Sequence, residues 1–114
     1  MRDDLVAFID ARLDEDADLA RRCDGGDDCG QWVARGHTVD FCQVDLPGFH
    51  PTIARHVARH DPARVLREVA AKRRVLRRHR PERVGDRVVC RVDGDPFPCA
   101  DVRDLAAPYA DHPR

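Results

Sequence analysis

Two long segments of this chain, residues 3–23 and 61–79, repeat apolar side chains at helical spacing. Each segment therefore has one apolar stripe and one charged face, which is typical of an amphipathic helix. The second segment opens with Asp61-Pro62, an aspartate cap followed by proline at the first helical position. We expect the two helices to pack through their stripes, which are Leu5, Val6, Ile9, Leu13, Ala17 and Ala20 in the first and Val65, Leu66, Val69 and Leu76 in the second.

The remaining segments predict shorter elements. Residues 50–59 and 99–109 have the spacing of short helices, and residues 31–34, 39–44 and 87–92 have that of strands. A chain of 114 residues supports one core. The sequence thus predicts a single domain, residues 1–114, of mainly α (α+β) class. It would contain three to four helices, a small β-hairpin and a loop-rich middle.

Charge is sorted along the chain although the net charge is only −1. Residues 1–45 carry 12 acids and five bases, whereas residues 61–91 carry 11 bases and four acids. If the two long helices pack through their apolar stripes, their charged faces point apart and cannot neutralise one another. Sorted charge suggests a binding partner. The candidate interaction residues are Asp10, Asp14 and Asp18 on the first helix and Arg64, Arg67, Arg74 and Arg78 on the second.

Three stretches, in order along the chain, resemble a family of small actinobacterial and actinophage proteins classed as a domain of unknown function. They are RDDLVAFIDARLDEDADLAR, HVARHDPARVLREVAAKRRVL and PCADVRDLAAPYADHP, which together cover about half of the chain. The resemblance implies no activity. The family often carries Cys-x2-Cys ahead of the Pro-Cys, whereas here Asp93 follows Cys90 at that spacing.

Cysteine, histidine and aspartate near the C-terminus form a first candidate metal site. Cys90, Asp93 and Cys99, with His79 or a helix histidine as the fourth ligand, supply the donor types of a structural zinc site. The spacing Cys-x8-Cys is not diagnostic, however. The alternative, which the spacing favours, is that these are ordinary reduced cysteines and that Cys99 packs at a helix start.

A second candidate set lies in the loop-rich middle. Cys23, Cys29, His37 and Cys42 have the right number of donors for zinc, and a region with few apolar residues gains most from a metal. The alternative is thiols without a common site.

No basic segment followed by an apolar one opens the chain, so we expect a cytoplasmic, reducing location in which cysteines are thiols or metal ligands rather than disulfides.

No glycine-rich phosphate loop or nucleophile motif is visible, so the sequence favours a non-enzymatic accessory protein. It would bind another protein through a charged helix face. The alternative is a nucleic-acid-binding regulator with an arginine-rich helix, stabilised by zinc; a membrane partner is not expected. A weaker hypothesis is a metal-dependent enzyme built around His56, His60 and a cysteine. The two histidines share a helix face but lack the glutamate of catalytic motifs with this spacing.

Overall fold

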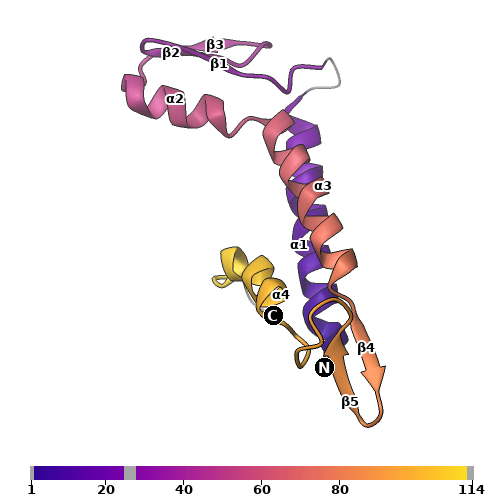
Figure 1. Cartoon of the computed structure of the whole chain (residues 1–114). Coiled ribbons are helices and arrows are strands. Elements are labelled where there is room, and N and C mark those ends of the chain that lie inside the picture. The colour runs from indigo at the N-terminus through magenta and orange to yellow at the C-terminus, as the bar shows by residue number, and fades with distance from the viewer. Residues whose placement is uncertain (1, 25–27, 113–114) are drawn as a thin grey trace. The chain divides into compact units, whose positions relative to one another are not determined.

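The computed structural model describes residues 2–24 and 28–112 (Figure 1). The chain divides into two compact units, one of Met1–Asp14 with Ala70–Arg114 and one of Glu15–Val69. The boundaries fall inside the two long helices, α1 (Arg2–Cys23) and α3 (Pro62–Arg78). Both helices lie where the apolar spacing predicts them.

In unit 2 (Glu15–Val69), a three-stranded antiparallel sheet packs against one helix. Its strands β1 (Val33–Arg35), β2 (Thr38–Asp40) and β3 (Asp45–Leu46) lie in the order β1-β2-β3, and α2 (Pro51–Arg59) contacts β1 and β2. The hairpin of β1 and β2 is confirmed, although its strands are shorter than expected. The third strand was not predicted, because its two residues are too short to show a pattern.

Side-chain caps set the starts of the helices in this unit. The Asp61 carboxylate accepts the backbone N–H of Arg64 (2.9 Å), as the Asp-Pro signal predicts. Its other oxygen accepts the N–H of Trp32 (3.2 Å) and so ties α3 to the segment before β1. At the start of α2, Nδ1 of His50 accepts the N–H of Thr52 (3.2 Å).

In unit 1, the first part of α1 and the last part of α3 lie side by side and run antiparallel (Figure 1). Ile9 and Leu13 are fully buried, and Leu76 is nearly so. Arg73 and Asp14 form an ion pair between the two helices. The expectation that their charged faces cannot neutralise one another is therefore wrong. The long stem of an arginine can lie along the apolar stripe while its guanidinium reaches an acid on the neighbouring helix.

The rest of unit 1 is a hairpin followed by a short helix. Strands β4 (Pro81–Val84) and β5 (Arg87–Cys90) pair antiparallel directly after α3 (Figure 1), and α4 (Ala100–Ala106) continues into the 3₁₀ helix η1 (Ala107–Tyr109). Strand β4 was missed because Pro81 signals a helix end. It is the first residue of its strand, a position where proline is tolerated.

The α+β class is confirmed, with four α-helices and two small antiparallel sheets in the part of the chain that is described. The single domain stays a prediction. None of the helices described combines the length and the apolar character needed to cross a membrane.

Candidate metal centre

The four residues of the first candidate set converge in unit 1. Each of His79, Cys90, Asp93 and Cys99 offers one ligand atom, and these atoms lie within 4.8 Å of one another. Elsewhere in the described residues, no other group of three or more such ligands comes together. The cluster can hold a metal ion.

Local structure brings the first two ligands together. His79 directly follows α3, and its backbone N–H donates to the carbonyl of Val75 (3.1 Å), which continues the helical geometry by one residue. The chain then turns through the β4–β5 hairpin, where Arg91 N–H donates to the carbonyl of Arg80 (2.9 Å). This return places Cys90, the last residue of β5, beside the end of α3.

A tight turn after β5 supplies the third ligand, Asp93. Two backbone hydrogen bonds close the turn, from Cys90 N–H to the Asp95 carbonyl (2.7 Å) and from Gly94 N–H to the Cys90 carbonyl (2.8 Å). Gly94 has φ of +73°, in the left-handed region that glycine adopts without a steric penalty. The fourth ligand, Cys99, stands at the N-cap of α4, where its carbonyl accepts the N–H of Arg103 (3.0 Å).

Three ligand atoms surround one nitrogen of His79. Its Nδ1 lies 3.3 Å from Sγ of Cys90, 3.5 Å from Sγ of Cys99 and 3.4 Å from Oδ2 of Asp93. An imidazole nitrogen has either one lone pair or one hydrogen, so it cannot form good hydrogen bonds with all three. A metal ion at their centre would satisfy all four groups at once. The alternative of ordinary reduced cysteines explains the position of Cys99 at a helix start, but not this convergence.

Burial affects the protonation of the site. His79, Cys90 and Cys99 are buried, whereas the side chain of Asp93 retains 29% of its exposure. Burial, which disfavours the charged thiolate, is the main reason that the pKa of Cys99 is raised from 9.0 to about 11. A metal must therefore displace the Cys99 proton, and binding should tighten as pH rises.

Asp101 is a part of the site that sequence reasoning missed. Its Oδ2 lies 3.3 Å from Nε2 of His79, the nitrogen that points away from the cluster. A carboxylate at this position keeps the hydrogen on Nε2 and leaves the lone pair of Nδ1 for a metal. The only sequence signal is an acid in the first turn of α4, which a helix start explains equally well.

We expect Asp101→Ala to weaken metal binding about 10- to 100-fold, because carboxylates that orient a ligating histidine typically contribute that much. The affinity can be measured by competition with a chromophoric zinc chelator. Asp104→Ala, an exposed acid of the same helix, is the matched control. Equal affinities of the two variants would contradict an orienting role for Asp101.

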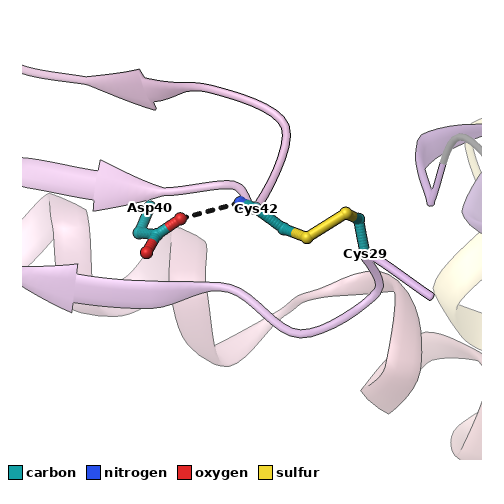
Figure 2. Close-up of a disulfide and its surroundings, with 3 residues drawn as sticks. All are labelled: Cys29, Asp40 and Cys42. Carbon is teal, nitrogen blue, oxygen red and sulfur yellow. Dashed lines mark hydrogen bonds between the residues drawn. A yellow bond between two sulfur atoms is a disulfide. The ribbon is translucent and has the colours of Figure 1, made fainter. Parts of the chain in front are cut away.

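The second candidate set is not a metal site. Cys29 and Cys42 form a disulfide, with Cα atoms 5.2 Å apart (Figure 2). The hairpin returns the chain so that the turn after β2 meets the segment before β1, and Cys42 N–H donates to the Asp40 carboxylate (2.8 Å). His37 instead faces the backbone, with Nδ1 3.0 Å from the Phe49 carbonyl, and Cys23 is a free, exposed thiol. The expectation that the cysteines form no disulfide is wrong for this pair, while Cys23, Cys90 and Cys99 are free.

His56 lies in the last turn of α2 and His60 is the residue that follows the helix, with their ring centroids 4.4 Å apart. Both are exposed, and Nδ1 of His60 contacts the carbonyl of His56 (2.8 Å), which suits a helix end. They belong to no convergent ligand group in the described part of the chain. The geometry gives a metal-dependent enzyme at this pair no support.

Several candidate interaction residues are neutralised by neighbours. Arg64 pairs with Glu68 (2.8 Å), Asp18 with Arg22 (3.1 Å) and Asp14 with Arg73. Arg67 is exposed on α3. The remaining candidates, Asp10, Arg74 and Arg78, line two hollows of unit 1. One hollow is lined by Val6, Asp10, Arg73, Leu76, Arg77 and Arg80, and the other by Arg74, Arg77, Arg78, Arg91 and Val92.

Comparison with protein families identifies a family that the chain matches. The family described as "Family of unknown function (DUF6221)" matches residues 2–114. No curated protein and no solved structure is significantly similar to the chain. An uncharacterised family is thereby confirmed, and its actinobacterial and actinophage origin stays a prediction.

Proposed function

Since this chain belongs to the DUF6221 family of unknown function, we propose a function from its own side chains. The protein is a non-enzymatic accessory protein that binds another protein through the basic face of α3. A zinc ion at His79, Cys90, Asp93 and Cys99 has a structural role in it.

The proposal depends mainly on the arginines that unit 1 leaves without acids. Among the described residues, Arg74, Arg77 and Arg78 form no ion pair, whereas Arg73 on the same helix pairs with Asp14. Three uncompensated guanidinium groups in the last turns of α3 repel one another. The helix dipole offsets part of this electrostatic repulsion, because it favours cations at the C-terminal end of a helix. An acidic surface on a partner would offset more of it.

The ligand types and the separations around Nδ1 of His79 support zinc as the metal. For a tetrahedral ion with ordinary zinc bond lengths, neighbouring N and S ligands lie about 3.6 Å apart and neighbouring N and O ligands about 3.4 Å apart. The separations around Nδ1 of His79 are 3.3 and 3.5 Å to the sulfurs and 3.4 Å to the oxygen. Two thiolates also select against Mg²⁺ and Ca²⁺, which prefer oxygen ligands.

The number of ligands supports a structural role. Four protein side chains fill a tetrahedral zinc site, so no position remains for a substrate or an activated water molecule. Elemental analysis of protein purified without a histidine tag tests this part of the proposal. We expect one zinc per chain, and protein without stoichiometric zinc would contradict it.

Charge reversal on α3 should abolish partner capture. We expect wild-type protein to retain its partner from a native host lysate at low salt and to release it at high salt, since exposed charge pairs are screened by ions. The variant Arg74→Glu/Arg78→Glu should retain none. The matched control is Arg55→Glu/Arg59→Glu, which reverses two exposed arginines at the same spacing on α2. No salt-sensitive partner of the wild type, or equal loss in both variants, would count against the proposal.

A nucleic-acid-binding regulator is the second candidate, because clustered arginines also neutralise phosphates. The structure supports this function less well, since Arg64 and Arg73 already pair with acids and the row of arginines along α3 is therefore not uniformly basic. A mobility shift with duplex and single-stranded DNA distinguishes the two functions. A shift by the wild type that Arg74→Glu/Arg78→Glu abolishes would favour the regulator over the accessory protein.

A further inference from the structure

One hollow of unit 1 lies between the last turns of α3 and the turn after β5 that carries the ligand Asp93. Arg74, Arg77 and Arg78 line it from α3, and Arg91 and Val92 line it from the turn after β5. These two turn residues lie in sequence between the ligands Cys90 and Asp93. Four cations and an exposed valine thus surround one hollow, and no acid lines it.

We propose that this arginine hollow is the docking site for an acidic peptide segment of the partner, and that the metal ion completes the site by holding Arg91 and Val92 in place. The inference rests on the proposed function and names both its partner chemistry and its regulation. The occupant is a short stretch of chain that carries several carboxylate or phosphoryl groups.

The chemistry of the lining favours a peptide. Guanidinium groups bind carboxylates and phosphoryl groups through paired hydrogen bonds, and arginine clusters are a recurring means of recognising acidic and phosphorylated motifs. The exposed Val92 adds an apolar contact, which a peptide side chain can cover. The lining contains no aromatic ring on which a nucleobase could stack, so single-stranded nucleic acid fits less well.

The metal acts on Arg91 through geometry. Arg91 directly follows the ligand Cys90 in the chain, and the backbone N–H of Arg91 donates to the carbonyl of Arg80 (2.9 Å). A metal that binds both Cys90 and Asp93 also fixes the other side of the Arg91–Val92 pair. The metal thus lowers the conformational entropy of the Arg91–Val92 turn before the peptide binds. Peptide binding then costs less, because it does not have to order this turn itself.

A change in the charge of the cluster does not explain why metal binding should favour peptide binding. A zinc ion with two thiolates and one carboxylate has a net charge of −1, which equals that of the carboxylate with two neutral thiols. Arg91 pairs with Glu82, with Nε and Oε2 3.8 Å apart and both side chains at least half exposed. Such an exposed pair is weak, so a peptide anion can replace Glu82.

Fluorescence anisotropy with a labelled glutamate octapeptide and a labelled peptide with two phosphoserines tests the site. We expect the zinc-loaded wild type to bind at least one of them and Arg91→Gln to weaken binding about five- to tenfold, a typical effect of one charged hydrogen bond at an exposed site. Arg83→Gln, an exposed arginine outside the hollow, should not change binding. No binding of either peptide, or equal effects of Arg83→Gln and Arg91→Gln, would overturn the docking site.

Chelation tests the role of the metal. Removal of zinc should weaken peptide binding by the wild type about fivefold but weaken binding by Arg91→Gln very little, because the residue that the metal holds is already lost. If chelation weakens both proteins equally, general unfolding explains the loss and the coupling is wrong. Peptide should in turn raise the zinc affinity of the wild type by the same factor.

The outcomes separate this inference from the proposed function. A partner captured from lysate in an Arg74- and Arg78-dependent manner, together with no binding of either peptide, would refute the docking site alone. Failure of lysate capture together with Arg91-dependent peptide binding would refute the accessory role and leave the site. Tighter binding of a single-stranded oligonucleotide than of an equally charged peptide would overturn the peptide as the occupant.

Discussion

His79→Ala is expected to leave the protein without zinc and to lower its free energy of unfolding by at least about 3 kcal/mol. Structural zinc in small domains binds with apparent free energies of about 10 kcal/mol or more at neutral pH, and that energy stabilises the fold. The substitution also leaves two buried thiols and the Asp93 carboxylate without their shared partner. Elemental analysis and denaturant titration followed by far-UV circular dichroism measure the two effects.

Two control variants show whether the loss is specific to the cluster. Cys23→Ala removes a free thiol outside it, and His56→Ala removes an exposed histidine of α2. We expect both to retain one zinc per chain and near-wild-type stability, because exposed substitutions rarely change stability by more than about 0.5 kcal/mol. If His79→Ala retained stoichiometric zinc, the assignment of the ligands would be refuted.

Loss of the disulfide is the second large effect. Cys29→Ala/Cys42→Ala should lower the stability of the β1–β3 region by about 3 kcal/mol, since a loop of this length is expected to lose that much chain-entropy stabilisation. Trp32, the only tryptophan, lies beside Phe41 with ring centroids 4.7 Å apart, so its fluorescence reports on this region. The denaturation midpoint measured by fluorescence should fall.

Reduction provides the matched comparison. Dithiothreitol should lower the fluorescence midpoint of the wild type to that of the double variant and leave the variant unchanged. In denatured, unreduced, metal-free wild type, an alkylating reagent should modify three cysteines, and after reduction five. Five modified cysteines before reduction would show that the pair is not oxidised.

The elements that local patterns specify were predictable. Apolar spacing locates α1 and α3, and Asp61-Pro62 sets the start of α3, because both signals act within a few residues of the chain. Strands β3 and β4 were missed for a related reason. One is too short to show a pattern, and the other begins at a proline that also signals the end of a helix.

The composition of the candidate site was predictable, but its formation was not. Cys90, Asp93 and Cys99 lie within ten residues and have the donor types that zinc prefers, so the sequence alone names these three ligands and leaves the choice of the histidine open. That all four ligands meet at one place is visible only in the structure, where the β4–β5 hairpin returns the chain to His79. Asp101 cannot be recognised without the structure, because its role depends on the orientation of the His79 ring.

What the sequence by itself determined is thus local: the long helices, the aspartate cap of α3, the sorting of charge and the identity of three C-terminal ligands. The tertiary structure decided which cysteines pair, which acid neutralises Arg73, and which arginines of α3 share a hollow with the turn after β5. The physical reason is distance along the chain. Helical periodicity and capping depend on neighbours a few residues away. Pairs such as Cys29 and Cys42, or Asp14 and Arg73, meet only where separate segments pack together.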